Sequence, residues 1–129
     1  MDTTEKKIMV VDDNEDLIYS VKRSLGDIAP KYSFIEANGG KKCISILEDG
    51  AKPDVILLDI MMPGMDGWET AAQIKSNSTW RNIPIIFLTA KTDDLSKNMG
   101  KLTAEDYIEK PFDIYDLKER IEKVLQSNN

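Results

Sequence analysis

Asp59 follows the apolar run Val-Ile-Leu-Leu at residues 55–58 and precedes a loop rich in proline, glycine and methionine. An apolar run of this length is typical of a strand that is buried on both faces. Asp59 is therefore expected at the carboxyl end of a central strand, where ligand crevices open in parallel sheets. A carboxylate there can be a nucleophile, a metal ligand or both, and it can equally be a helix cap or a loop-fixing acceptor.

Other apolar runs of the chain also end on polar residues. The first run ends at Asp12 and Asp13. The fourth ends at Thr89, and the fifth is followed by Lys110. Because the carboxyl ends of parallel strands share one edge of a sheet, the sequence predicts that three carboxylates, one hydroxyl and one ammonium group surround the same crevice.

These groups together suit a particular chemistry. Carboxylates that lie close together raise one another's pKa values unless a cation neutralises them, and oxygen ligands select Mg²⁺, or Mn²⁺, over zinc and copper. An ammonium group and a hydroxyl can both bind phosphate oxygens. The set is therefore suited to phosphoryl transfer onto an aspartate. Taken singly, the acidic pair could only cap a helix, Thr89 could be an ordinary strand residue, and Lys110 could be a solvated surface lysine.

Five apolar runs alternate with five amphipathic stretches, a pattern that predicts a parallel sheet with helices on both faces. We expect a doubly wound α/β fold with strand order 2-1-3-4-5 and five helices. The strands are predicted at residues 8–11, 32–37, 55–58, 84–88 and 106–108. The helices are predicted at residues 16–25, 39–47, from about 67, 93–102 and 115–125, with Asn14 or Asp13 as the first N-cap.

The bulk properties of the sequence restrict its function. Its 129 residues suit one domain, with a core at about residues 7–125, and its net charge of −6 argues against direct nucleic-acid binding. No apolar run is long enough to span a membrane and residues 1–7 are not a signal peptide, so we expect a cytoplasmic protein without membrane insertion. The single cysteine, Cys43, is expected as a small core residue.

Four motifs occur in order along the chain: VVDDNED, VILLDIMMPGMDG, IIFLTA and YIEKPF. This set resembles the receiver domain of two-component response regulators over nearly the whole chain. The resemblance implies a flavodoxin-like fold and a signalling domain rather than an enzyme. It implies a phosphoryl donor that is a sensor histidine kinase, a phosphotransfer protein or a small acyl phosphate. Because the chain contains no histidine, a phosphohistidine donor must belong to another protein.

The resemblance assigns the phosphoryl and metal sites. Asp59 matches the phosphoacceptor. Asp12 and Asp13 match the acidic pair that, with Asp59, binds Mg²⁺. Met61 matches the position whose backbone carbonyl ligates the metal. The Met61 side chain and Lys91 flank the path of an attacking water, so both are expected to tune the lifetime of the phosphoryl group.

The resemblance also assigns a conformational switch. Thr89 matches the hydroxyl that turns toward the phosphoryl group, and Lys110 matches the lysine that contacts this group. Tyr107 matches the aromatic residue whose ring moves inward when the hydroxyl moves. The resemblance also assigns structural positions to Pro63, Gly67, Ala90 and Pro111. It implies that the peptide bond before Pro111 is cis.

The switch is expected to change the face formed by the fourth helix, the fifth strand and the fifth helix. That face would bind an unknown downstream effector or form a homodimer on phosphorylation. Its charged residues are interpreted as solvated: Asp106, Glu109, Lys118 and Glu119. The sequence shows no output domain after Leu125, so the chain is expected to be either a stand-alone receiver of the chemotaxis-regulator kind or a domain of a longer protein, and a native stop after Asn129 would favour the first.

Three alternatives compete with this interpretation. A phosphohydrolase of the haloacid-dehalogenase type requires a second acid two residues after its nucleophile, where this chain has Met61. A receiver-like binding module that is never phosphorylated usually lacks an acidic or lysine position that this chain retains. A flavodoxin-like cofactor carrier requires a phosphate-cradling loop, and Gly39-Gly40 is a weak match to one.

Overall fold

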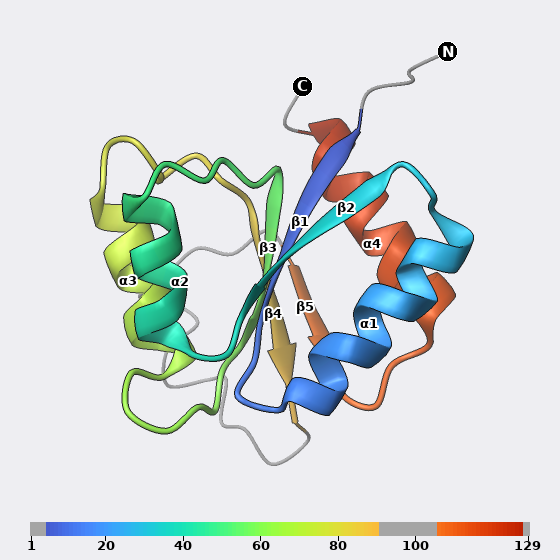
Figure 1. Cartoon of the computed structure of the whole chain (residues 1–129), viewed down its shortest axis with the longest axis horizontal. Helices are drawn as coiled ribbons and strands as arrows, with labels where there is room; N and C mark the ends of the chain where they lie inside the picture. Colours follow the sequence, from blue (N-terminus) through green and yellow to red (C-terminus); the bar gives the residue numbers. More distant parts are fainter. Residues whose placement is uncertain (1–4, 91–105, 128–129) are drawn as a thin grey trace.

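The computed structural model describes residues 5–90 and 106–127. Five parallel strands form one sheet in the order β2-β1-β3-β4-β5 (Figure 1). The strands are β1 (Lys6–Val11), β2 (Tyr32–Ala37), β3 (Val55–Asp59), β4 (Ile85–Thr89) and β5 (Asp106–Glu109). The helices described are α1 (Glu15–Ile28), α2 (Gly40–Glu48), α3 (Gly67–Ser76) and α4 (Ile114–Ser127). The predicted fold and strand order are confirmed, and the helix predicted at residues 93–102 lies outside the described residues.

Helices cover both faces of the sheet, with α2 and α3 on one face and α1 and α4 on the other (Figure 1). Successive side chains of a strand point to opposite faces, so the central strands contribute to two cores. Leu58 and Phe87 belong to the core that includes α2 and α3, whereas Leu57 and Leu88 belong to the core that includes α1 and α4. Cys43 is fully buried in the first core, as predicted.

Every residue of β3 and β4 is buried, which explains why their sequences are continuous apolar runs. β4 begins at Ile85, one residue later than predicted. Pro84 has no N–H to donate to a neighbouring strand, although its carbonyl oxygen accepts a hydrogen bond of 2.9 Å from the amide of Ile56. Both Asp59 and Thr89 are the last residues of their strands. The helices α1 and α4 extend beyond their predicted bounds at each end.

Side-chain caps set where α1 and α3 begin. The Asn14 carboxamide oxygen accepts hydrogen bonds from the amides of Asp16 (3.0 Å) and Leu17 (3.2 Å), which confirms Asn14 as the cap of α1. In α3 the Asp66 carboxylate accepts from the Glu69 amide at 2.9 Å, and Glu69 accepts from the Asp66 amide at 3.2 Å. This capping box fixes where the loop after Asp59 ends. None of the described helices has the length and apolar composition required to cross a membrane.

The first residue of α3, Gly67, lies directly against the end of β3. Its amide donates a 2.7 Å hydrogen bond to the carbonyl oxygen of Ile60. A Cβ atom at position 67 would collide with the carbonyl oxygen of Asp59 and would lie 2.6 Å from the Cα atom of Ile60. Because both obstacles are backbone atoms, only glycine allows α3 to begin this close to Asp59.

We therefore expect Gly67→Ala to lower the free energy of unfolding by about 2–3 kcal/mol, because the new methyl group must displace backbone. Urea denaturation followed by circular dichroism measures the change. The matched control is Gly26→Ala in α1, where the added Cβ atom would meet only Phe34 at 3.9 Å. Alanine there should stabilise the helix by up to about 1 kcal/mol. Equal stability of Gly67→Ala and the wild type would contradict the backbone collision.

Candidate functional site

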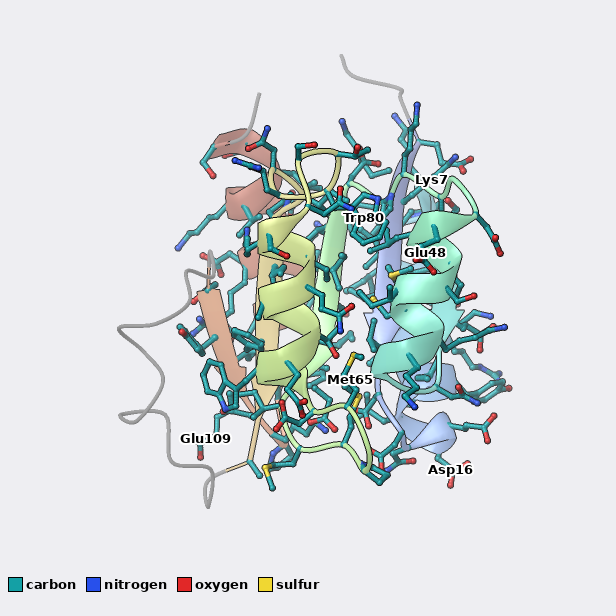
Figure 2. The ribbon with its side chains drawn as sticks, turned by 90° about the vertical axis from the view of Figure 1, so that its left-hand side faces the viewer. Lys7, Asp16, Glu48, Met65, Trp80 and Glu109 are labelled. Atoms are coloured by element: carbon teal, nitrogen blue, oxygen red, sulfur yellow. The ribbon has the colours of Figure 1, made fainter. Side chains whose placement is uncertain are left out.

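The strand register brings the predicted site residues to one edge of the sheet. Val11 of β1 is paired with Leu58 of β3, so the residues that follow them, Asp12 and Asp59, lie side by side. Asp59 is itself paired with Leu88, the residue before Thr89. Figure 2 shows this end of the molecule, where Asp16, Met65 and Glu109 are labelled, opposite the end that carries Lys7 and Trp80.

An acidic group forms at this edge. Ligand atoms of Asp12, Asp13 and Asp59 all lie within 4.8 Å of one another. Asp12 is 1% exposed and Asp59 is 5% exposed, whereas Asp13 is exposed to solvent. Three carboxylates at such distances could hold a hard divalent cation. Met61, two residues after Asp59, is 65% exposed, and the metal-binding role of its carbonyl oxygen stays a prediction.

Lys110 supplies the positive charge that balances part of this group. Its Nζ atom lies 2.8 Å from Oδ2 of Asp12 and 3.2 Å from Oδ1 of Asp59. Its backbone amide donates a 2.6 Å hydrogen bond to the carbonyl oxygen of Thr89, which ties the ends of β4 and β5 together. The peptide bond between Lys110 and Pro111 is cis, as the resemblance implies. The structure thus brings Lys110 to both buried carboxylates.

The electrostatics of the group follow from burial and crowding. Burial raises the pKa of Asp59 to about 6, with the negative charge of Asp12 as the next cause, while Lys110 opposes the shift. Burial lowers the pKa of Lys110, but its hydrogen bonds and ion pairs with Asp12 and Asp59 outweigh burial, so that the net shift is upward. Lys110 therefore stays charged, and its lowering effect on the pKa of Asp59 is smaller than the combined effect of burial and the neighbouring carboxylates.

The predicted switch residues lie on β4 and β5. Thr89 is 4% exposed at the end of β4, and Ala90, which follows it, is exposed. The Tyr107 ring is half-buried and stacks on Phe87, with a centroid distance of 5.5 Å and an interplanar angle of 27°. Burial raises the pKa of Tyr107. Lys91, predicted beside the site, lies outside the described residues.

The interpretation of Asp106 as a solvated charge is wrong. Nη1 of Arg120 lies 3.0 Å from each carboxylate oxygen of Asp106 and donates a 2.9 Å hydrogen bond to the carbonyl oxygen of Tyr107. The pair joins α4 to β5 beside Tyr107. Sequence reasoning missed Arg120 because its spacing to Asp106 carries no periodic signal. Only the packing of α4 on β5 brings the two residues together.

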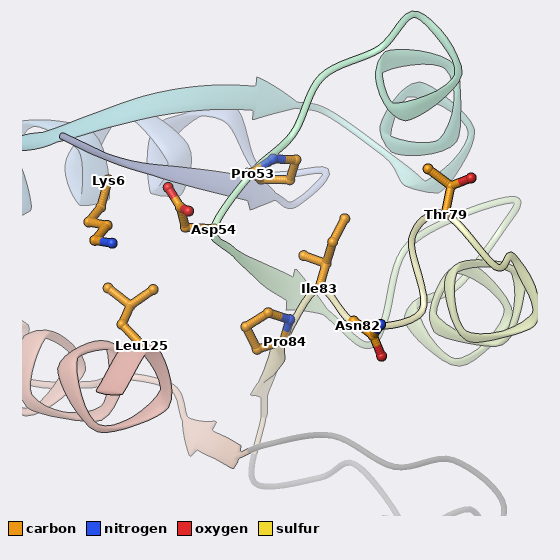
Figure 3. A pocket seen from close by; sticks show the side chains of 8 residues that line it. All are labelled: Lys6, Pro53, Asp54, Thr79, Asn82, Ile83, Pro84 and Leu125. Carbon is orange, nitrogen blue, oxygen red and sulfur yellow. The ribbon is translucent and has the colours of Figure 1, made fainter. Parts of the chain in front are cut away.

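A separate cavity of about 270 Å³ lies at the opposite edge of the sheet (Figure 3). Its lining includes Lys6, Asp54 and Pro84, which stand at or just before the first residues of β1, β3 and β4. It is therefore at the amino ends of the strands, whereas the acidic group is at their carboxyl ends. This cavity takes no part in the chemistry of Asp59.

Comparisons with known proteins agree with this geometry. The family model of the response regulator receiver domain matches residues 8–122. Among curated proteins, the chain is 38% identical over 116 residues to the uncharacterized transcriptional regulatory protein YrkP of Bacillus subtilis (strain 168), covering 89% of this chain and 47% of that protein. It is 36% identical over 126 residues to the alkaline phosphatase synthesis transcriptional regulatory protein PhoP of the same strain, covering 94% and 49%. The chain thus spans about half the length of these curated relatives.

One solved structure is similar to this chain over nearly the whole length of both proteins. It is the CheY-like response regulator receiver domain protein from Methanospirillum hungatei JF-1, which is 41% identical, with a TM-score of 0.77, and the match covers 95% of this chain and 93% of that one. The matched residues 8–122 include the acidic group, Thr89 and Lys110. The chain belongs to the response regulator receiver domain family.

Proposed function

We propose that this chain accepts a phosphoryl group on Asp59 and signals through the resulting change in conformation. The donor is the phosphohistidine of a sensor histidine kinase or phosphotransfer protein, or a small acyl phosphate. The observation that carries the proposal is the contact of Lys110 with Asp12 and Asp59, the two buried members of the acidic group. Crowded carboxylates, a lysine and a nearby hydroxyl are the groups that phosphoryl transfer onto an aspartate requires.

In the transfer step, a carboxylate oxygen of Asp59 attacks the phosphorus atom of the donor. The new bond joins this oxygen to phosphorus, and the bond from phosphorus to the donor nitrogen or oxygen breaks with its electron pair on the leaving group. The ammonium group of Lys110, 3.2 Å from Asp59, is placed to bind a phosphoryl oxygen. A phosphohistidine donor lies in another protein because this chain has no histidine.

The acidic group fits Mg²⁺, and Mn²⁺ as a substitute. Asp12, Asp13 and Asp59 offer oxygen ligands that these ions prefer, and the backbone carbonyl of Met61 is proposed as a further ligand. The geometry supports the assignment, because three carboxylates carry more negative charge than the one ammonium group of Lys110 neutralises. When bound, the ion supplies positive charge that offsets the charge of the carboxylates and the phosphoryl oxygens.

The proposed switch links the phosphoryl group to the surface of β5 and α4. Thr89 reorients toward the phosphoryl oxygens, and the ring of Tyr107 moves with it. This motion shifts the balance between two conformers of the β5–α4 surface, which binds a downstream effector or a second copy of the chain. The ion pair between Arg120 and Asp106 lies in this surface, where it supports the backbone of Tyr107.

Incubation with acetyl phosphate and Mg²⁺ should add one phosphoryl group to the wild-type chain, detected by intact-mass spectrometry. Asp59→Asn should abolish the adduct because the amide cannot act as the nucleophile, and EDTA should prevent its formation. Asp54→Asn is the matched control, since Asp54 also adjoins β3 but lies at the opposite edge of the sheet. An adduct that persists in Asp59→Asn, or one independent of the metal, would contradict the proposal.

Met61→Gln should shorten the lifetime of the phosphoryl group. Met61 follows Asp59 by two residues and is 65% exposed, and its side chain is predicted from the sequence to flank the path of an attacking water, which an amide could hydrogen-bond and orient. We expect the half-life of the adduct to fall about fivefold, the factor that corresponds to one hydrogen bond of about 1 kcal/mol. The decay is followed by mass spectrometry after removal of acetyl phosphate. Met61→Leu keeps an apolar side chain and should leave the half-life unchanged. A half-life of the adduct in Met61→Gln equal to that of the wild type would contradict the role of position 61 in the lifetime of the phosphoryl group.

Asp59→Asn should stabilise the metal-free protein at neutral pH. In the folded state the pKa of Asp59 is raised from 3.8 to about 6, so ionisation of this carboxyl favours unfolding. The cost of the charge is absent below about pH 4, accumulates as the pH rises toward 6, and is complete above that value. We therefore expect a gain on the order of 2 kcal/mol for Asp59→Asn at pH 7.5 and little difference at pH 4.

Urea denaturation at both pH values measures this gain, and Asp27→Asn, which changes an exposed carboxyl of α1, is the control. Addition of Mg²⁺ at pH 7.5 should stabilise the wild type more than Asp59→Asn, because the ion binds the folded state and Asp59 is one of its ligands. A wild type as stable as Asp59→Asn at pH 7.5 without metal would contradict the cost of holding the Asp59 charge buried beside Asp12.

A further inference from the structure

Three aromatic rings from three different elements form a row across one face of the sheet. They are Trp68 of α3, Phe87 of β4 and Tyr107 of β5, which we call the aromatic row. The ring centroids of Trp68 and Phe87 are 4.8 Å apart with a tilt of 54°, and those of Phe87 and Tyr107 are 5.5 Å apart with a tilt of 27°. Both distances are typical of attractive aromatic pairs. Phe87 is fully buried, whereas the two outer rings are half-buried.

At the Trp68 end of the aromatic row, Gly67 connects α3 to the backbone of Asp59 and Ile60. Trp68 directly follows Gly67, whose amide donates a hydrogen bond of 2.7 Å to the carbonyl oxygen of Ile60. Gly67 also packs so closely on the carbonyl of Asp59 that a Cβ atom has no room there. A displacement of the Asp59 peptide therefore displaces the first turn of α3, and Trp68 with it.

At the other end, two hydrogen bonds hold the backbone of Tyr107, and its ring stacks on Phe87. The Tyr107 amide donates a 2.8 Å hydrogen bond to the Asp106 carboxylate, and its carbonyl oxygen accepts one of 2.9 Å from Arg120. With the backbone fixed, a change at this residue has to be a change in the orientation of its ring. The face of that ring rests on Phe87, so Phe87 and the residue behind it, Trp68, define the orientation.

We propose that Trp68 and Phe87 are positioning residues for the ring of Tyr107, and that the aromatic row couples Asp59 to Tyr107 through α3. The inference rests on the proposed function, in which Tyr107 is a switch residue. It adds a second connection to the one that runs through Thr89. Because coupling between two sites is reciprocal, the orientation of Tyr107 also affects how readily Asp59 is phosphorylated.

The test uses the full chain labelled with 3-fluorotyrosine and observed by ¹⁹F NMR, with the Tyr107 signal assigned from Tyr107→Phe. Trp68→Leu should shift the Tyr107 signal before any phosphoryl donor is added. It should also change the rate of phosphorylation by acetyl phosphate roughly two- to tenfold, the range that corresponds to one aromatic pair. Trp68→Phe keeps a ring in place and should restore both values.

Trp80→Leu is the matched control. Trp80 is half-buried against the same core, but no ring contact of it occurs among residues 5–90 and 106–127. The Trp80→Leu variant should therefore leave the ¹⁹F signal of Tyr107 unchanged. An unaltered Tyr107 signal in Trp68→Leu would overturn the proposal, and so would an equal shift in Trp80→Leu, which would indicate general loosening of the core.

A replacement variant and a second measurement complete the test. If Trp68→Leu loses its fold by circular dichroism, Trp68→Met replaces it, because a flexible thioether fills the space without providing a ring. The extent of phosphorylation is measured by intact mass in the same samples. A wild type that takes up no phosphoryl group would overturn the proposed function, whereas the Tyr107 signal of the unphosphorylated chain would still decide whether Trp68 positions the ring.

Discussion

The proximity of two buried carboxylates is the constraint on which the site depends. The parallel pairing of β1 with β3 places Asp12 beside Asp59, and both are almost inaccessible to solvent. Like charges in such surroundings repel strongly, because burial weakens the screening that water provides. Lys110 lowers this cost by contacting both carboxylates, yet the pKa of Asp59 is still raised to about 6. The folded chain therefore holds three carboxylates against one ammonium group, an arrangement that could hold a divalent cation.

The rest of the fold keeps this unfavourable arrangement in place. The central strands are buried on both faces between two apolar cores, so that a shift of β1 or β3 in register would disrupt the packing of both cores. The loop that follows Asp59 is closed by the capping box of α3 and by the contact of Gly67 with the peptide of Asp59. Stability gained in the cores and at the caps thus offsets the electrostatic cost at the edge of the sheet.

The sequence predicts much of this arrangement, because the relevant information is local or topological. Apolar runs reveal the buried strands, and parallel strands necessarily bring Asp12, Asp59 and Lys110 to one edge. The cap at Asn14 follows from its position before an amphipathic stretch. Contacts between distant elements were not predictable in this way. The ion pair of Asp106 with Arg120 and the row of Trp68, Phe87 and Tyr107 depend on how α4 and α3 pack on the sheet, and no spacing along the chain encodes that packing.

These tertiary contacts limit how a change at Asp59 can reach the surface. Two hydrogen bonds restrict movement of β5 along β4. The Lys110 amide donates one of 2.6 Å to the carbonyl oxygen of Thr89, and Arg120 donates one to the carbonyl oxygen of Tyr107. Under the proposed function, these two hydrogen bonds favour a signal that is carried across β5 by side chains over one carried by movement of the strand. Lys110 and Tyr107 lie three residues apart on the same segment, one paired with the buried carboxylates and the other stacked on Phe87. Under the proposed function, a phosphoryl group on Asp59 would act on both: on Lys110 through charge, and on Tyr107 through the space left by Thr89 and the contacts of Phe87.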